Sequence, residues 1–587
     1  MLDSLALTFA PRAIAGIYAT HFLALLLLVL PVTAGAALIW LLIDHTFGHA
    51  RLHSRAWIAW CSSTLFFVLF FYALRSVVIA WSARHGIAVS LPAWLIVTMP
   101  LSALLARYAR GLLENLVAFS WFLALAGALC LPFAFIDVDR TPPAMPIAVP
   151  RTRPDVLLIT IDTLAARQMS LYGADQRTTP NIDRLGAQAL VFERAYAGAN
   201  FTTAGINTLL TGRYPDAHRA IQLGGRALPR YRSASLPALL HKAGYRSTYV
   251  STNNNAAPWR TGYARYFDDG VGDATQWRPY FCEDELIRWL PYNCQLNHPF
   301  INLVTGFFYR NGADNLEFDG SLVTNGVQRL IGRARHDPRP MFLWTHLTPP
   351  HDPYAAPAGC LGRFYSGPES RTAASSQPIY GVRPPNIPLR ATRVLEQRYR
   401  ESLWCVDRTV ARIVKEFGAR GRPFVLIVSA DHGESFTPWL TGHGGPYLNE
   451  DAIRIPLLVA LPGMTRGRRT DAIASQIDIL PMVSAILQGT DTDGLVALVE
   501  ANRRREPALA MEFIDNARLA PLTRGGIAAV GKDAKYIRYI SPPGPFAGMK
   551  EQVLGDATET STEGQRLRAA IANRLALYGG RMDGARQ

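Results

Sequence analysis

Residues 155–162 read DVLLITID, a short apolar run of branched side chains that ends in a carboxylate. This pattern is typical of a central parallel strand, because such a strand is buried on both faces. Two similar runs follow, MFLWTH at 341–346 and FVLIVS at 424–429. Helical patterns occur between the runs, over 181–189 and 397–417. Strands that alternate with helices predict an α/β domain built on a central, mostly parallel sheet.

Polar residues stand at the carboxyl ends of these three runs. Asp162 ends the first run, His346 ends the second, and Asp431 and His432 follow the third. In α/β sheets, ligands bind beyond the carboxyl ends of the strands. Carboxylate and imidazole groups are also good ligands for divalent metal ions. The sequence therefore predicts a metal-binding site at this edge of the sheet.

Two more histidines belong to segments with a restricted or unusual backbone. His351 lies in the proline-rich loop HLTPPHDPY, and His443 lies in TGHGG, where glycines permit turns and close approach. Taken singly, such residues have plainer interpretations. Asp162 could cap a helix, the Asp431–His432 pair could form a surface turn, and His346 could be a packed strand-end residue. Their convergence from separate segments favours a functional site.

The first quarter of the chain has a different character. Four uncharged apolar stretches run over 22–43, 56–74, 86–106 and 115–136. Each is long enough to cross a bilayer, which takes about 20 residues. A signal peptide has a shorter apolar core, and buried helices of a soluble protein would not come four in a row. We therefore expect a transmembrane domain of about four helices over residues 1–138.

A proline-rich linker over 139–153 follows, and the catalytic domain is expected over 154–587. Four spans would leave the N-terminus and this domain on the same side. Arginines favour the first and third loops in the cytoplasm, by a margin of four to three. We therefore expect a multi-pass protein of the cell (inner) membrane, with its catalytic domain extracytoplasmic or periplasmic.

The composition excludes several classes of protein. Hydrophobic residues make up 49% and charged residues 18%, which argues against disordered, collagenous and coiled-coil proteins. The net charge of +15 is dispersed and accompanies no nucleic-acid reader motif. Anionic lipid headgroups are the simpler partner for this charge, so we expect a membrane partner and no nucleic acid.

Four of the six cysteines lie outside the predicted spans. An even number there suits an oxidising compartment. Three disulfide connectivities, or four free thiols, remain open. The near-neighbour pairs Cys282–Cys294 and Cys360–Cys405 are favoured.

The sequence over 155–215 resembles the N-terminal signature of the sulfatase branch of the alkaline phosphatase superfamily. It reads DVLLITIDTLAARQMSLYGADQRTTPNIDRLGAQALVFERAYAGANFTTAGINTLLTGRYP. The later segments SADHGE, GHGG, EDAIRIPLLVALPG and SQIDILPMV resemble further blocks of that family, in the right order. The resemblance covers about residues 152–490. It implies an alkaline-phosphatase-like α/β domain with a smaller C-terminal sheet. The C-terminal segment AKYIRYI itself predicts an edge strand of that smaller sheet.

The chain departs from the sulfatase pattern at informative positions. Sulfatases carry a C/S-x-P-S-R motif whose first residue is oxidised to formylglycine, and alignment on LLTGR at 209–213 puts Thr202 there. Threonine cannot become formylglycine and the supporting arginine is absent, which disfavours sulfate-ester hydrolysis by that route. Thr163 replaces a second acidic residue, and Asp431–His432 replaces an Asp–Asn calcium pair. Imidazole suits zinc or manganese better than calcium.

A threonine nucleophile with Asp and His ligands resembles membrane-bound phosphoethanolamine transferases and lipoteichoic acid synthases, the latter being phosphoglycerol transferases. The former usually have five spans, whereas four are predicted here. In this resemblance Thr202 is the nucleophile, with Thr203 the less favoured neighbour. His351 and His443 take the places of histidines that contact the phosphoryl group and assist proton transfer. The implied metal ligands are Asp162, Thr202, Asp431 and His432.

We therefore expect a membrane-anchored, metal-dependent phosphotransferase. It would move a phosphoethanolamine- or phosphoglycerol-type group from a phospholipid to a cell-envelope glycan or glycolipid, through a covalent Thr202 intermediate. A bound dication, zinc first and manganese second, would activate the hydroxyl and neutralise phosphoryl charge. The alternative is a phosphodiesterase, phosphatase or sulfatase-like hydrolase of the same fold. A non-catalytic scaffold is the third reading, and the intact candidate residues argue against it.

Overall fold

The computed structural model describes most of the chain that follows the predicted membrane domain. The four predicted spans, nearly all of the linker and the Cys282–Cys294 pair lie outside the described residues. Among the helices that are described, none combines the length and the apolar character needed to cross a bilayer. The described residues are 153–221, 225–253, 255–271, 320–352, 354, 356, 359–367, 389–437, 441–513, 524–541, 548–555 and 561–578.

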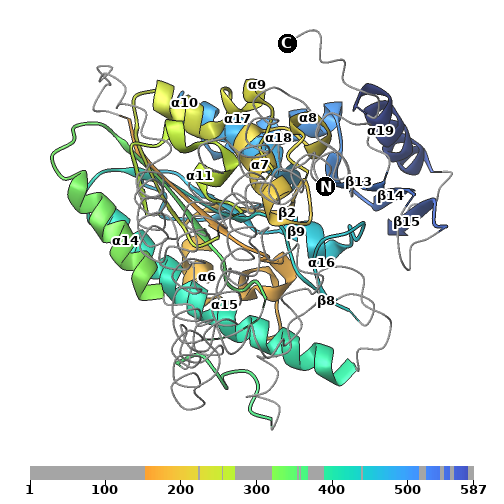
Figure 1. Cartoon of the computed structure of the whole chain (residues 1–587), viewed down its shortest axis with the longest axis horizontal. Coiled ribbons are helices and arrows are strands. Elements are labelled where there is room, and N and C mark those ends of the chain that lie inside the picture. The colour runs from red at the N-terminus through yellow and green to blue at the C-terminus, as the bar shows by residue number, and fades with distance from the viewer. Residues whose placement is uncertain are drawn as a thin grey trace, which may run out of the picture. The chain divides into compact units, whose positions relative to one another are not determined.

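A nine-stranded sheet runs through the described part of the chain (Figure 1). Its strands are β1 (Asp155–Ile161), β2 (Leu190–Tyr196), β3 (Arg246–Ser251), β4 (Asp269–Val271), β5 (Met341–Leu347), β6 (Phe424–Ala430), β9 (Arg454–Ile455), β10 (Leu457–Ala460) and β11 (Arg468–Ser475). The order is β11-β2-β10-β6-β1-β5-β3-β4, with β9 paired to β2. The strands around β1 are parallel, whereas β9 and β10 run antiparallel to their neighbours. The sheet is therefore mixed, with the predicted parallel arrangement at its centre.

Helices cover both faces of this sheet, which is why its central strands are mostly apolar. Every residue of β1 and β5 is buried. In Figure 1, α6, α14 and α15 cover one face, and α7, α10, α17 and α18 cover the other. The helices are α6 (Pro180–Gly186), α7 (Thr202–Thr211), α8 (Pro215–His218), α9 (Pro229–Arg232), α10 (Leu236–Lys242), α11 (Pro258–Thr261), α14 (Gly320–Arg333), α15 (Leu389–Gly418), α16 (Glu450–Ile453), α17 (Ile479–Ile486), α18 (Thr492–Arg505) and α19 (Thr562–Tyr578).

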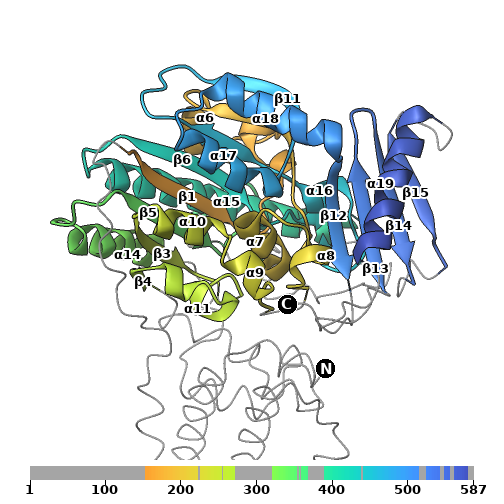
Figure 2. The ribbon, with the colours of Figure 1, turned by 90° about the horizontal axis from the view of Figure 1, so that it is seen from above.

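The predicted smaller C-terminal sheet is present. Its antiparallel strands are β12 (Ala508–Phe513), β13 (Gly525–Val530), β14 (Ala534–Ile540) and β15 (Glu551–Gly555), in that order. Helix α19 packs on one face of the sheet, and β12 lies beside α8 (Figure 2). The AKYIRYI segment is β14, which pairs with β13 and β15. The expectation that it is an edge strand was wrong, because β15 covers its outer side.

Helix α7 is held close to the end of β6 by a glycine. A Cβ atom on Gly205 would lie 2.3 Å from the carbonyl oxygen of Asp431, which a real side chain could not tolerate. The helix ends at Gly212, whose φ of 62° is left-handed and suits a glycine C-terminus. The first turn of α7, which begins at Thr202, is therefore fixed against the segment that carries Asp431 and His432.

A disulfide bond joins Cys360 to Cys405, with 6.0 Å between their Cα atoms. One of the two favoured cysteine pairs is thus confirmed. Cys405 lies in α15, so the bond ties the segment after His351 to a long helix. Glu401 of the same helix accepts hydrogen bonds from the backbone amides of Phe364 and Tyr365. Helix α15 therefore anchors this loop at several points.

Candidate metal centre and active site

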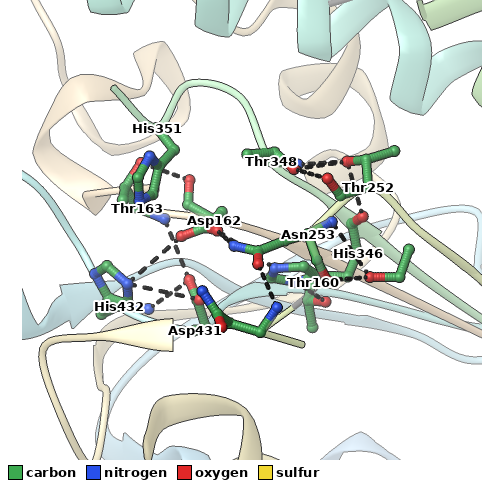
Figure 3. Close-up of polar contacts among 12 residues, drawn as sticks. Thr160, Asp162, Thr163, Thr252, Asn253, His346, Thr348, His351, Asp431 and His432 are labelled. Atoms are coloured by element: carbon green, nitrogen blue, oxygen red, sulfur yellow. Dashed lines mark hydrogen bonds and ion pairs between the residues drawn. The ribbon is translucent and has the colours of Figure 1, made fainter. Parts of the chain in front are cut away.

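Four carboxylate and imidazole side chains converge at the carboxyl ends of β1, β5 and β6 (Figure 3). Strand β1 lies between the other two, so residues just after their ends are neighbours. His346 Nε2 lies 3.5 Å from Asp162 Oδ2, and His432 Nε2 lies 3.5 Å from Asp162 Oδ1. His432 Nε2 is also 3.6 Å from Asp431 Oδ2. All four side chains are fully buried.

Each of these side chains keeps one buried atom without a hydrogen bond in the described part of the protein. Burying a polar atom without a partner is costly, so such atoms need an explanation. Four of them in one place point to an ion that would complete their coordination. The atoms are Asp162 Oδ1, Asp431 Oδ2, His346 Nε2 and His432 Nε2.

The opposite atoms of the same side chains are firmly held. His432 Nδ1 donates to the Gly433 carbonyl at 3.0 Å, which leaves the lone pair on Nε2. His346 Nδ1 is 2.9 Å from the Thr160 hydroxyl. Asp431 Oδ1 accepts from its neighbour's amide, that of His432, at 2.9 Å. Asn253 Nδ2 donates to Asp162 Oδ2 at 2.5 Å. These contacts fix the orientation of the side chains before any ion binds.

The two carboxylates have opposite electrostatic environments. Burial opposes ionisation of Asp162, but the neighbouring His351, His346 and His432 hold its pKa well below the usual range. Burial and the adjacent charge of Asp162 raise the pKa of Asp431 well above the usual range. A divalent cation would favour the ionised form of both groups. The arrangement is therefore incomplete without positive charge.

Two histidine–carboxylate pairs lie beside the four ligands. His351 Nδ1 is 2.8 Å from Asp352 Oδ1, and His443 Nδ1 is 3.0 Å from Glu434 Oε1. The ring of His443 stands between the other two, 4.8 Å from the ring of His351 and 4.6 Å from that of His432. This geometry connects the four candidate ligands to groups that can move protons.

These two histidines differ in their tendency to hold a proton. Burial works against the charged form of His351, but the carboxylates of Asp352 and Asp162 raise its pKa well above the ordinary value. Burial and the nearby His351 lower the pKa of His443 to about 4. A protonated His351 beside a neutral His443 provides one proton donor and one acceptor.

Thr202 stands at the first position of α7 and is 5% exposed, whereas Thr203 is fully buried. Asn200 lies two residues before Thr202 and contacts the loop of His443. Its backbone carbonyl accepts a hydrogen bond from the Gly444 amide at 3.1 Å. Gly205, on the other side of Thr202 in the sequence, packs against Asp431. Thr202 therefore lies between the segment of Asp431 and His432 and the loop of His443. Its side chain makes no hydrogen bond to another described residue.

Thr163, which directly follows Asp162, has an unusual backbone. Its φ of 57° is left-handed, a costly conformation for a β-branched residue. Its amide donates to Asp431 Oδ1 at 3.2 Å, and its carbonyl accepts from Tyr399 at 2.7 Å. The strain thus accompanies a direct link between the ends of β1 and β6.

The structure brings together most of the predicted site and adds residues to it. Asp162, Asp431 and His432 lie together as predicted, and His346 joins them although its plainer reading remained open. Thr202 stays a prediction as a metal ligand and nucleophile. Sequence reasoning missed three supporting residues, namely Asn253, Asp352 and Glu434. The last two adjoin candidate residues in HDPY and SADHGE, whereas Asn253 carried no signal.

Known proteins agree with this fold. A model of the sulfatase family matches residues 154–490. An uncharacterized sulfatase, YidJ of Escherichia coli, is 24% identical over 57% of this chain and 68% of its own length. The human N-acetylgalactosamine-6-sulfatase is 25% identical over 56% of this chain, and the match spans only 60% of that enzyme. The solved phosphonate monoester hydrolase SpPMH of Silicibacter pomeroyi has a TM-score of 0.50 at 16% identity, covering 74% of this chain and 96% of its own.

These findings support the predicted superfamily but not the finer resemblance to phosphoethanolamine transferases and lipoteichoic acid synthases. The relatives above are named as sulfatases, which are hydrolases. An enzyme that hydrolyses its substrate therefore fits better than the expected transferase. Because the family model matches more than half of its length, the chain belongs to the sulfatase family of the alkaline-phosphatase-like superfamily.

Proposed function

We propose that the protein is a metal-dependent hydrolase of phosphate esters, phosphodiesters in particular, with Thr202 as its nucleophile. The observation that carries this proposal is the position of Thr202. A threonine opens the helix that is packed, through Gly205, against Asp431. Sulfatases need a formylglycine at this place, and a threonine cannot supply one.

The metal proposed for this site is zinc, with manganese as the second candidate. Asp162, Asp431, His346 and His432 would hold it, since their unpaired atoms converge. Two imidazole nitrogens and two carboxylate oxygens suit zinc better than calcium, which prefers oxygen ligands alone. When bound, such an ion lowers the pKa of a nearby hydroxyl and stabilises negative charge on phosphoryl oxygens.

In the first step the Thr202 oxygen attacks phosphorus and the bond from phosphorus to the leaving oxygen breaks. The hydroxyl proton passes to His443, and His351 gives a proton to the departing alkoxide. In the second step water attacks phosphorus, and His351 takes a proton from it. The bond between phosphorus and Thr202 then breaks, and the threonine oxygen regains its proton from His443. The Asp352 and Glu434 carboxylates orient the two imidazoles.

Water is proposed as the acceptor because the named relatives are hydrolases. The solved SpPMH is a phosphonate monoester hydrolase, so this fold accommodates hydrolysis at phosphorus. A glycan acceptor and a phospholipid donor would instead make the enzyme the transferase expected from the sequence. The Cys360–Cys405 bond supports an extracytoplasmic location, because disulfides persist in oxidising compartments.

The test compares wild type with Thr202→Ala, and with Thr203→Ala as the matched control. The zinc-loaded full-length protein is given bis-p-nitrophenyl phosphate, p-nitrophenyl phosphate and p-nitrophenyl sulfate. We expect phosphoester turnover that falls by about 10³-fold or more in Thr202→Ala and persists in Thr203→Ala. Intact-mass spectrometry should find a phosphoryl adduct on Thr202.

Three results would contradict the proposal. Cleavage of the sulfate ester alone would show that the enzyme keeps sulfatase chemistry despite its threonine. An adduct on Thr203 would move the nucleophile by one residue. Release of product that requires an added glycan, with the phosphoryl group found on that glycan, would favour the transferase.

A further inference from the structure

The side chain of Gln476 connects two segments that carry candidate site residues. Gln476 begins the short helix η8 (Gln476–Asp478) and is 1% exposed. Its Oε1 atom accepts from the Gly198 amide at 2.8 Å. Its Nε2 atom donates to the carbonyls of Ala430 and Asp431 at 2.9 and 2.6 Å. A donor on one side and two acceptors on the other leave only one orientation for the amide group.

The first of these segments leads to the proposed nucleophile. Gly198 precedes Thr202 in the connection between β2 and α7. Its carbonyl accepts from the Met511 amide at 2.9 Å, so both polar groups of its backbone are paired. A Cβ atom on Gly198 would lie 2.5 Å from the methyl carbon of Thr208, a residue of α7. Because the segment and the helix are in such close contact, a shift of Gly198 would also displace the helix that begins at Thr202.

The second segment carries two of the candidate metal ligands. Ala430 ends β6, and Asp431 and His432 follow it directly. The Asp431 carbonyl oxygen that accepts from Gln476 is also the atom against which Gly205 of α7 packs. The Gln476 side chain and the nucleophile helix therefore meet at one backbone atom of a candidate ligand.

The backbone of Gln476 is itself firmly held. Asp478 Oδ2 accepts from the Ser475 amide at 2.8 Å and closes the turn. Asp478 Oδ1 accepts from Asn502 at 2.8 Å and from Arg503 at 3.0 Å. The short helix η8 also packs against α7. A side chain on a fixed backbone can set the distance between the two segments that it joins.

We propose that Gln476 is a positioning residue, which sets the distance between Thr202 and the four candidate metal ligands. This inference rests on the proposed function, because it concerns the nucleophile of that same site. Gln476 acts through Gly198 and Asp431, and takes no direct part in the reaction. Its effect is expected to be large, because a misplacement of about 1 Å at a reacting centre costs about 10²-fold in rate.

The first test compares Gln476→Met with Gln168→Met in the zinc-loaded full-length protein. Gln168 is a matched control, because it is fully buried and also joins two other groups. It donates to Glu396 at 2.7 Å and accepts from Arg400 at 2.7 Å. We expect Gln476→Met to lower kcat for bis-p-nitrophenyl phosphate by about 10²-fold, with KM and zinc content unchanged. Gln168→Met should be less stable in urea and keep its kcat.

Three results of these kinetics would overturn the proposal. They are a wild-type kcat in Gln476→Met, an equal loss of kcat in both variants, and a loss confined to KM or zinc content. If Gln476→Met does not fold, Gln476→Glu replaces it. The acid has the same shape and keeps an acceptor for the Gly198 amide, but it has at most one donor for the two carbonyls. A lower kcat at unchanged KM in this variant supports the proposal, and a wild-type kcat overturns it.

A second measurement does not depend on turnover and separates the two proposals. In full-length Thr202→Cys protein loaded with Co²⁺, a thiolate bound to cobalt gives a charge-transfer absorption band in the near ultraviolet. We expect this band in Thr202→Cys, loss of most of its intensity when Gln476→Met is added, and no loss when Gln168→Met is added. If wild type cleaves no phosphate ester but this pattern is found, the proposed function fails and the positioning role stands. A band that is absent from Thr202→Cys, or that survives Gln476→Met, overturns the positioning role.

Discussion

Strand β1 has a buried aspartate at each end, and the two residues have opposite surroundings. Asp155 is 1% exposed and accepts hydrogen bonds from Arg420 at 2.8 Å and Arg422 at 3.0 Å. The amide of Met341 donates to it as well, at 2.8 Å. Asp162 is fully buried, is surrounded by histidines and another carboxylate, and keeps Oδ1 without a hydrogen bond among the described residues.

This difference separates a structural carboxylate from a functional one. The charge of Asp155 is compensated by two guanidinium groups that belong to the chain itself. The site of Asp162 contains a second carboxylate, and its unpaired atoms point to an ion from outside. Burial and residue type are the same at both ends of the strand. The neighbouring charged groups alone therefore decide which aspartate stabilises the fold and which one takes part in the function.

The largest effect is expected from Asp162→Asn. The amide keeps the shape of the side chain but loses the charge that a cation needs. We expect the bound metal to be lost and kcat/KM to fall by about 10³-fold, the upper range for removal of one electrostatic stabiliser. Metal content by mass spectrometry and turnover of bis-p-nitrophenyl phosphate measure the two effects. Full metal occupancy with normal turnover would show that Asp162 is structural, like Asp155.

The matched change at the other end, Asp155→Asn, should affect stability instead. Arg420 and Arg422 would lose their charged partner, and breaking a buried ion pair costs about 3 kcal/mol or more. We expect the free energy of unfolding, measured in urea, to fall by this amount. Metal content and turnover per folded molecule should stay at the wild-type level. A loss of activity without a loss of stability would remove the contrast between the two ends.

A smaller effect, on the pH dependence of stability, is expected at His218. This buried imidazole has a hydrogen-bond partner at each of its two nitrogens. Its Nδ1 accepts from the Ala220 amide at 3.0 Å, so the ring is neutral and its Nε2 meets the Thr208 hydroxyl at 3.1 Å. Burial lowers the pKa of His218 from 6.5 to about 3. Between these values the unfolded chain holds the extra proton, so stability is present above pH 6.5 and is lost as the pH falls.

Below pH 6.5, His218 alone should make the free energy of unfolding fall by up to about 1.4 kcal/mol for each pH unit. Urea unfolding at several pH values should show it, and His218→Gln should remove it. The exposed His336→Gln is the control and should leave the slope unchanged. An identical slope in His218→Gln would assign the pH dependence to other groups.

Local sequence predicted the strands of the site well, because β1, β5 and β6 are buried on both faces and read as continuous apolar runs. It could not predict Asn253, because that residue reaches Asp162 only through the strand order β1-β5-β3. The error at AKYIRYI has a similar cause. Whether a strand lies at an edge depends on its neighbours, and here the neighbour is β15.

The sequence by itself determined the chemical types available to this protein. It places a threonine where sulfatases have the formylglycine precursor, and it puts carboxylates and imidazoles after buried strands. Only the tertiary structure decided which of them act together. In DVLLITID each aspartate bounds an apolar run, and strand direction favours the second as a ligand, but the local sequence does not show what neutralises the first. Arg420 and Arg422 neutralise the first across more than 260 residues of chain, whereas the second meets His346 and His432. Electrostatic compensation depends on distance in space, which local sequence does not contain.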